Sequence, residues 1–377
     1  MPQKAIMIGA GQIGRGFIGQ VLFSAGYQIT FVEVSPSLVD SINHLGAYPV
    51  IVMGAEEHRV EITGIRAFLP TDDKLPEALA EAELVTTAVG PSILTKTAPT
   101  IVQAIRRRME LGVTRPLNVI ACENIDKGSS LLKRAVFAQL SQAELAHCAE
   151  FVGFPDAEVS RMVMPIHDSN PLTVKVEQYV EWVIDKAAVK GTLLPIQGLE
   201  LTDKPEAYIK RKMFSLTGHA MLGYLGYQKG YQYIFQAAFD DAIFSVVFRA
   251  LAECGQGWSR EYGLPEVEFY QYITVMLRRF SDSRMHDPCT RICREPLRKL
   301  GHDERFVAPA LTALKHGISP DAILVGIRAA LDYNSPEEPQ AVQLRQMLQE
   351  QGLDAVLETV LGLDRRDQLF RMIKAAV

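Results

Sequence analysis

The sequence has few cysteines, no long apolar run and no excess of positive charge, and each of these absences excludes a class of protein. Its five cysteines are an odd number without a CxxC pair, which disfavours a disulfide framework and a zinc site. No apolar run approaches the roughly 18 residues that a membrane-spanning helix needs. The net charge of −5 disfavours nucleic acid or an anionic membrane as the main partner.

What the sequence does contain is the composition of a globular protein, with 48% hydrophobic and 22% charged residues among 377. This length predicts two domains. The first residues enter a strand-like run at once, without the charged and apolar segments of a secretory signal. We therefore expect a cytoplasmic protein, either a monomer or a homodimer, whose ligands are small molecules and include no metal.

The most informative stretch is KAIMIGAGQIGRGFIGQVLFSAGYQITFVEVSP, at residues 4–36. An apolar run from Ala5 to Ile8 leads into a glycine-rich turn, and a helix-like segment follows to about Ala25. A second β-like run then ends at Glu33. A strand, a GxGxxG turn, a helix and an acid after the next strand are together typical of dinucleotide binding.

Each glycine of this turn has a physical reason. Gly9 permits the tight turn, Gly11 lets the backbone approach a pyrophosphate, and Gly14 lets the helix pack on the strand. Glu33 is placed to accept hydrogen bonds from the adenosine ribose and repels a 2′-phosphate, which favours NAD over NADP. The predicted cofactor site therefore includes Gly9, Gly11, Gln12, Ile13, Gly14 and Glu33.

Two further apolar segments, LVTTAVGP (84–91) and LNVIACEN (117–124), are typical of buried parallel strands. Ligands bind at the carboxyl ends of such strands. We therefore place Val89, Gly90 and Asn124 at the rim of the cofactor site. From the pattern alone, a turn or helix-cap role for Asn124 is favoured over a role in the site.

From about Pro205 onward the apolar spacing is mostly helical, with predicted helices at Ala237–Ala252, Glu266–Phe280 and Val307–Lys315. The predicted fold class is α/β: an N-terminal Rossmann-type dinucleotide-binding domain followed by a mostly α-helical C-terminal domain. We set the first domain at residues 1–195 and the second, the substrate and catalytic domain, at 196–377.

The first helix of the second domain contains the segment KRKMFSLTGHA (210–220). On a regular helix Lys212, Ser215 and His219 fall at i, i+3 and i+7, on one stripe. A lysine, a hydroxyl and an imidazole on one stripe could transfer protons. From periodicity alone, however, a solvated helix face is the more frequent explanation.

Seven segments, taken in order, closely resemble the polyol-specific long-chain dehydrogenase (mannitol dehydrogenase) family: GAGQIGRGFIG, LVTTAVGP, PLNVIACENI, VGFPDAEVSRMVMP, EWVIDK, GLELTD and REPLRKL. The resemblance extends from Ala5 to about Val360. It implies an NAD-binding Rossmann domain, a mostly helical domain, no metal, and a lysine as catalytic base.

The resemblance also implies the activity and its residues. The short chain favours the sugar-phosphate branch, so we expect NAD-dependent interconversion of a polyol phosphate and a ketose phosphate, most simply mannitol 1-phosphate and fructose 6-phosphate. The family places an asparagine of the CEN segment, here Asn124, in the active site. It places a lysine and a histidine there from a K-x4-N-x2-H motif, here Lys212 and His219.

This chain departs from the family motif at the helix, which is one residue short and lacks the asparagine. Counting from Lys212 puts Thr217 at the asparagine position, whereas counting back from His219 puts Arg211 at the lysine position. Both ends fit only if a local loop or irregular turn absorbs the deletion, with Ser215 or Thr217 replacing the amide. The signature VSRMVMP also departs, with serine at 160 where the family has aspartate, although the following arginine is retained.

Substrate recognition is assigned to a compact basic group, Arg294, Arg298 and Lys299 of REPLRKL, which could bind a phosphate. A group of cations near a helix end with no ligand explains it equally well. Because the lysine–histidine segment is altered, two alternatives stay open. One is a dehydrogenase for a different hydroxy substrate, and the other is a weakly active NAD-binding member of the family.

Overall fold

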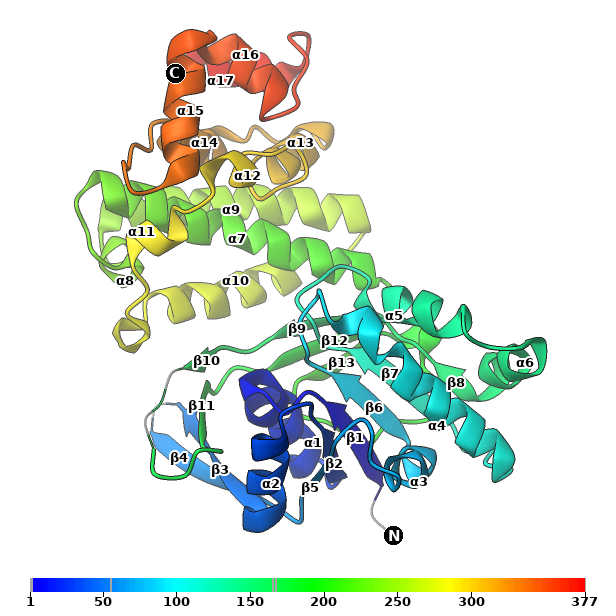
Figure 1. Cartoon of the computed structure of the whole chain (residues 1–377). Helices are drawn as coiled ribbons and strands as arrows, with labels where there is room; N and C mark the ends of the chain where they lie inside the picture. The colour runs from blue at the N-terminus through cyan, green and yellow to red at the C-terminus, as the bar shows by residue number, and fades with distance from the viewer. Residues whose placement is uncertain (1–2, 55, 165, 167, 377) are drawn as a thin grey trace. The chain divides into compact units, whose positions relative to one another are not determined.

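In the computed structural model, the first part of the chain is built on a six-stranded sheet in which all paired strands are parallel (Figure 1). The strand order is β5-β2-β1-β6-β7-β8, which is the 3-2-1-4-5-6 order of a dinucleotide-binding fold. The strands are β1 (Lys4–Ile8), β2 (Gln28–Val32), β5 (Arg66–Phe68), β6 (Leu84–Thr87), β7 (Leu117–Ala121) and β8 (Val152–Gly153).

Strand β1 separates two hydrophobic cores because successive side chains of a strand point to opposite faces. Ala5 and Met7 join the core beneath the first two helices, whereas Ile6 and Ile8 join the core beneath the later ones. The helices of this part are η1 (Gly14–Gly19, a π-helix), α1 (Gln20–Ser24), α2 (Pro36–Leu45), α3 (Leu75–Glu81), η2 (Leu94–Thr97), α4 (Ala98–Glu110), α5 (Gly128–Phe137), α6 (Gln142–Phe151) and η3 (Lys186–Ala188).

Two smaller sheets were not predicted. One has the order β10-β11-β3-β4 and the other β13-β12-β9. Strands β11 and β12 lie close together in the chain but belong to different sheets, because β11 pairs with β3 and β12 pairs with β9 and β13. The strands are β3 (Ala47–Met53), β4 (Glu57–Thr63), β9 (Ala157–Ser160), β10 (Val163–Met164), β11 (Val174–Glu177), β12 (Glu181–Asp185) and β13 (Leu199–Thr202).

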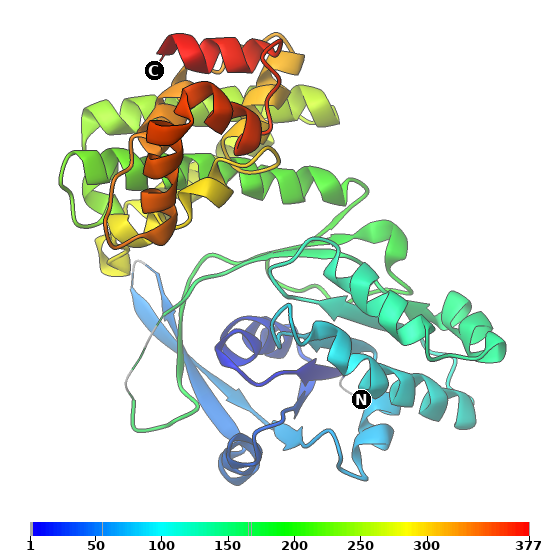
Figure 2. The same ribbon diagram turned by 45° about the horizontal axis from the view of Figure 1, so that its top comes forward.

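The second part of the chain is helical and is organised around α7 (Pro205–Gln228) (Figure 2). Buried residues occur all around this helix, and its glycines allow close approach: a Cβ at Gly218 would lie 2.8 Å from Leu251. The other helices are α8 (Ile234–Ala238), α9 (Asp241–Tyr262), α10 (Glu266–Phe280), η4 (Ser283–Met285), α11 (Cys289–Ile292), α12 (Pro296–Lys299), α13 (Val307–Lys315), α14 (Asp321–Leu331), α15 (Pro339–Glu350), α16 (Gly352–Thr359) and α17 (Gln368–Ala376).

The structure describes residues 3–54, 56–164, 166 and 168–376, and its contacts divide the chain into Met1–Pro205 and Glu206–Val377. The predicted fold class is confirmed, as are the helices at Glu266–Phe280 and Val307–Lys315, while the helix predicted from Ala237 begins later, at Asp241. Within the described ranges, no helix combines the length and the apolar character that crossing a membrane would require.

Candidate functional site

The glycine-rich turn after β1 has the backbone geometry that its sequence suggests. Gly9 has a φ of 96°, and a Cβ there would lie 2.6 Å from the carbonyl oxygen of Ala88. A Cβ at Gly14 would overlap the carbonyl oxygen of Gly9. Around Gly11, in contrast, a Cβ would meet no atom within 4 Å. The turn is therefore closed on its protein side and open at Gly11, where a ligand could approach the backbone.

The helix that follows the turn is widened into a π-helix, a feature that is often found at functional sites. Two of its carbonyls accept hydrogen bonds from buried side chains: Tyr48 Oη donates to Arg15 O at 2.9 Å, and Arg161 Nη1 donates to Gly16 O at 3.2 Å. Burial lowers the pKa of Arg161 to about 10. The arginine that follows Ser160 thus supports the helix beneath the turn.

Glu33, at the end of β2, is held by three backbone N–H groups. Its Oε2 accepts from Ala10 N at 2.9 Å, and its Oε1 accepts from Val34 N at 2.8 Å and from Ser35 N at 3.1 Å. The side chain is consequently fixed against the glycine-rich turn. Each carboxylate oxygen has more than one lone pair, so a fixed carboxylate can still accept hydrogen bonds from a ligand.

A cavity of about 540 Å³ opens beside this carboxylate. Its volume lies within the range of about 300–1,000 Å³ that is usual for small-molecule sites. Apolar side chains form most of the wall, with Lys96, Thr97 and Thr100 at one side. The lining residues are Ile8, Gly9, Gly11, Val32, Glu33, Val34, Pro70, Ala88, Val89, Ile93, Lys96, Thr97 and Thr100.

The other predicted cofactor residues lie in the loops around this cavity. Gln12 and Ile13 are exposed in the turn, and Gly90 follows β6 with a φ of 91°. Asn124 is exposed in the loop after β7. Gln12, Ile13, Gly90 and Asn124 do not themselves line the cavity, in contrast to Gly9, Gly11, Glu33 and Val89.

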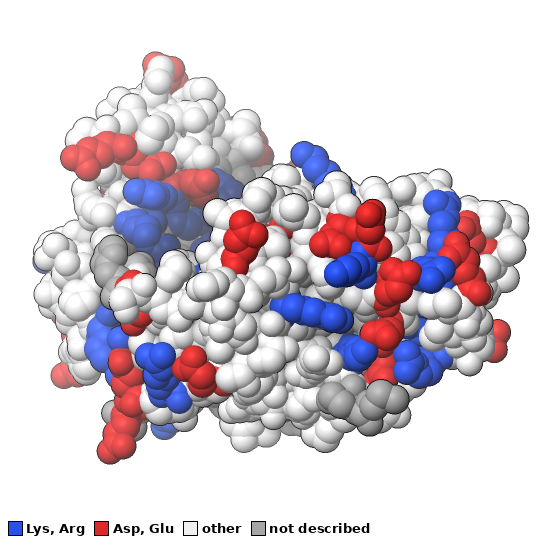
Figure 3. Space-filling model, turned by 60° about the horizontal axis from the view of Figure 1, so that its bottom comes forward, with Lys and Arg blue, Asp and Glu red and all other residues white. Residues whose placement is uncertain are grey.

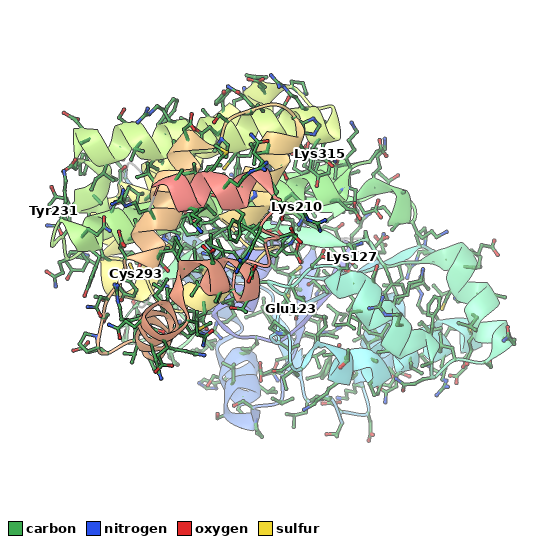
Figure 4. The ribbon with its side chains drawn as sticks, turned by 90° about the horizontal axis from the view of Figure 1, so that it is seen from above. Glu123, Lys127, Lys210, Tyr231, Cys293 and Lys315 are labelled. Atoms are coloured by element: carbon green, nitrogen blue, oxygen red, sulfur yellow. The ribbon has the colours of Figure 1, made fainter. Side chains whose placement is uncertain are left out.

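Glu123, next to Asn124, ties the ends of two strands together and has a role that the sequence did not predict. It is buried, and its carboxylate accepts from Thr87 Oγ1 at 2.7 Å and from Val89 N at 2.9 Å. Figure 4 labels Glu123 and Lys127, which both follow β7. Glu123 therefore fixes the loop that presents Asn124.

In the second part of the chain, Lys212 and His219 lie on α7, which is helical from Pro205 to Gln228. The loop or irregular turn that would restore the family spacing is absent from this helix, all of whose residues are described. Seven residues of a regular helix rise about 10.5 Å and leave the two side chains about 20° apart around the axis. Lys212 and His219 therefore share one stripe of the helix.

The contacts of neighbouring residues distinguish between the two ways of counting the motif. Arg211, the alternative to Lys212, is buried between the rings of Tyr208 and Tyr272, 4.4 and 4.3 Å from their centroids. This cation–π packing gives the guanidinium of Arg211 a structural role. Lys212 is only half-buried.

The two hydroxyls that could replace the missing amide both donate to backbone carbonyls. Ser215 Oγ donates to Lys212 O at 2.7 Å, and Thr217 Oγ1 donates to Arg305 O. Thr217 also lies about 160° around the helix from His219. Neither hydroxyl is therefore a ready donor to a substrate beside His219.

His219 contacts two side chains from later segments of the chain. Its ring stacks on Phe280 with centroids 4.6 Å apart, and its Nε2 lies 3.4 Å from Oδ2 of Asp287. Burial lowers the pKa of His219, and the charges of Arg305 and Arg291 act in the same direction while Asp287 opposes them. Both partners lie far along the chain from His219, and no local pattern marks them.

The predicted basic group is less open than its sequence suggests. Arg298 pairs with Glu295 at 2.7 Å and with Glu304 at 2.8 Å. Lys299 is buried and donates to the carbonyls of Ile292 and Arg294, and burial together with the charge of Arg305 lowers its pKa to about 8.

Arg294 is exposed, whereas Arg305, which was not predicted, has a side chain only 12% exposed. The Nε of Arg305 lies 3.4 Å from Glu304, and its terminal nitrogens form no hydrogen bond to any described residue. Burial lowers the pKa of Arg305. Arg305 is therefore more weakly paired than Arg298.

On the face drawn in Figure 3, groups of Lys and Arg lie beside groups of Asp and Glu, with wide uncharged areas between them. Among the described residues, no group of three or more histidines, cysteines, aspartates or glutamates is arranged to hold a metal ion.

Comparison with known proteins gives matches over nearly the whole chain. Residues 3–198 match the family model of the mannitol dehydrogenase Rossmann domain, and residues 204–377 match that of the mannitol dehydrogenase C-terminal domain. Mannitol 2-dehydrogenase of Pseudomonas fluorescens, solved as a ternary complex with NAD and D-mannitol, is similar with 19% identity and a TM-score of 0.65 over 96% of this chain and 87% of that one. A substrate-free D-sorbitol dehydrogenase is similar with 16% identity and a TM-score of 0.74 over 93% and 94%.

Proposed function

This chain belongs to the mannitol dehydrogenase family, and we propose that it is an NAD-dependent oxidoreductase that interconverts a polyol phosphate and a ketose phosphate. The simplest pair is mannitol 1-phosphate and fructose 6-phosphate. The observation that carries the proposal is the site in the first unit, where Glu33 and the open backbone of Gly11 line one cavity of about 540 Å³. Oxidation and reduction of a polyol carbon belong to the family, and the phosphate is our own extension.

The residues around this cavity fit NAD. Gly11 leaves room for a pyrophosphate at the start of a helix, where backbone N–H groups favour an anion. Glu33 is fixed in place to accept hydrogen bonds from ribose hydroxyls, and its negative charge repels the 2′-phosphate of NADP. When bound, NAD supplies the nicotinamide ring that exchanges hydride with the substrate.

We assign roles toward the oxygens of the substrate to three residues of this chain. Lys212, in its unprotonated form, takes the proton of the hydroxyl that is being oxidised. For Asn124, in the first unit, we keep the role that the family resemblance implies: its amide donates a hydrogen bond to a substrate oxygen and stabilises developing negative charge. His219 contacts a substrate oxygen and orients the polyol.

The phosphate specificity rests on the cations near α12. Arg298 already pairs with two carboxylates, and Lys299 donates to backbone carbonyls, so neither is free to move toward a ligand without losing those partners. Arg305 has a single contact of 3.4 Å with a carboxylate. We therefore assign Arg305 the leading part in phosphate binding, with Arg298 and Arg294 beside it and Lys299 supporting their loop.

Rates with matched substrates test this function. We expect reduction of fructose 6-phosphate with NADH and no comparable reduction of fructose, and likewise oxidation of mannitol 1-phosphate in preference to mannitol. Equal rates with and without the phosphate would contradict the phosphate assignment and leave an unphosphorylated polyol as the substrate.

One observation favours a second candidate, a family member that binds NAD but turns over slowly. The family asparagine is missing, and the hydroxyls of Ser215 and Thr217 both donate elsewhere. Micromolar NAD binding without turnover of any of the four substrates would establish this second candidate.

A further inference from the structure

The imidazole of His219 is held on two sides by residues outside its own helix. Phe280, at the end of α10, stacks against the ring at an interplanar angle of 15°. Asp287, just before α11, faces its Nε2 at 3.4 Å. The side chains of His219 and Asp287 are only 17% and 11% exposed. The plane of the ring and the direction of one of its nitrogens are therefore both fixed.

Asp287 is itself fixed as an ionised acceptor. Arg291 donates to both of its carboxylate oxygens, from Nε to Oδ1 at 2.6 Å and from Nη2 to Oδ2 at 2.5 Å. The carbonyl of Asp287 accepts from Ile234 N at 3.0 Å, which anchors the backbone. Burial acts to raise the pKa of Asp287, but the bonds from His219 and Arg291 outweigh it and the pKa is lowered. An ionised carboxylate only accepts, so the nitrogen that faces it carries a hydrogen.

From this geometry we propose that Asp287 is a positioning residue that holds His219 in its Nε2–H tautomer and leaves Nδ1 as an acceptor for a substrate hydroxyl. The proposal deepens the proposed function and relies on it for the identity of the substrate. It also changes the expected role of His219, since a neutral Nδ1 accepts a hydrogen bond from a hydroxyl and cannot donate one to an alkoxide.

The charges around the ring are consistent with a neutral imidazole. Asp287 is the negative group that faces it, and Arg291 and Arg305 are the positive ones. Burial lowers the pKa of His219 below its ordinary value, the two arginines lower it further, and Asp287 only partly opposes them. The ring is thus uncharged near pH 7, with one donor nitrogen and one acceptor nitrogen.

Nitrogen NMR of the full-length protein tests the tautomer directly. With 15N-labelled histidine, and with His219 assigned by comparison with His219→Gln, we expect a protonated Nε2 and an unprotonated Nδ1. In Asp287→Asn, Arg291 retains the amide oxygen, so the amide NH2 turns toward the imidazole and Nδ1 becomes protonated. Asp282→Asn is the matched control, because Asp282 pairs with Arg284 on the same connecting segment. A wild-type ring protonated at Nδ1, or a tautomer unchanged in Asp287→Asn, would overturn the proposal.

Kinetics supply a second readout, which a purely structural role would not move. We expect Asp287→Asn to lower kcat/KM for the polyol substrate by about 10- to 100-fold, because Nδ1 no longer accepts the hydrogen bond of the substrate hydroxyl, with the NAD Kd unchanged. The pKa of His219, followed by the same nitrogen shifts as the pH is varied, should also be lower in Asp287→Asn than in the wild type, because the carboxylate raises it. A His219 pKa that is unchanged or higher in the variant contradicts the inference. If the enzyme turns over no polyol at all, the proposed function fails while the NMR result still decides the tautomer.

Discussion

The two units of this protein differ in how far apart in sequence the residues of each site lie. In the first unit, Gly9, Gly11, Gly14 and Glu33 come from one short stretch, and their roles follow from backbone geometry and one carboxylate. In the second unit, His219 depends on side chains from two later segments. A site made by a turn can be identified from a local motif, whereas a site made by converging side chains needs the fold.

Among substitutions that test this difference between the two units, we expect the largest loss of activity at Lys212. Lys212→Met should lower kcat by about 1,000-fold, since it removes the base that we propose takes the hydroxyl proton, and should leave NAD binding unchanged. Lys210→Met, which removes a half-buried cation two residues earlier on α7, is the matched control and should keep most of the activity. Steady-state rates and equilibrium NAD titration measure both effects. A fully active Lys212→Met variant would show that Lys212 of α7 is not the base that takes the hydroxyl proton.

Arg305 and Arg298 provide a test within the second unit. Arg305→Gln should raise the KM for fructose 6-phosphate by about 10- to 100-fold, because it removes the charge-assisted hydrogen bond that we propose Arg305 makes to the phosphate. Arg298→Gln should have a smaller effect, since that guanidinium is held by Glu295 and Glu304. Measured KM values for each variant decide the order. An equal rise of KM in both variants would indicate that the whole basic group binds the phosphate.

The two ends of the glycine-rich turn should respond differently to the same substitution. Gly14→Ala places a methyl group against the Gly9 carbonyl and should cost about 1–3 kcal/mol of unfolding free energy, as overpacking usually does. Gly11→Ala meets no protein atom and should change stability by less than about 0.5 kcal/mol while weakening NAD binding. Denaturant unfolding measures the effect of each substitution on stability, and NAD titration measures its effect on cofactor binding. Unchanged NAD binding in Gly11→Ala would mean that the cofactor does not approach this backbone.

The smallest of these effects is expected at Glu33. Glu33→Gln should raise the NAD Kd by about 10-fold, corresponding to the loss of a hydrogen bond to a charged group. It should also reduce the preference for NAD over NADP, because the repulsion of a 2′-phosphate is removed. Parallel titrations with the two cofactors measure this ratio. A ratio that does not change would show that another residue discriminates between them.

The sequence predicts the dinucleotide-binding sheet well because buried parallel strands and their glycine turn are local patterns. It does not predict β3 and β4, because most side chains of β4 are exposed and β3 pairs with β11 from much later in the chain. The same limit applies to the sites. No sequence pattern near His219 predicts its contact with Asp287. The segment REPLRKL likewise does not indicate that Lys299 is buried, or that Arg305, which lies outside this segment, is weakly paired.

For the lysine–histidine segment, sequence comparison alone does not determine how the two side chains are oriented on the helix. Eight residues, as in the family motif, would place the two side chains about 80° apart on a regular helix, whereas seven residues leave them about 20° apart. The segment is α-helical from Pro205 to Gln228, without a loop or irregular turn that would restore the family spacing. His219 instead lies on the same stripe as Lys212, and its partners Phe280 and Asp287 set its orientation.

The central claim is that this chain reduces a ketose phosphate with NADH and that Lys212 supplies the proton chemistry. The most direct measurement is the loss of reduced-nicotinamide absorbance with purified protein, NADH and fructose 6-phosphate, beside Lys212→Ala. Rapid NADH oxidation that disappears in the variant is the predicted result. Absent turnover in the wild type despite tight NAD binding, or equal turnover in both proteins, would contradict the account.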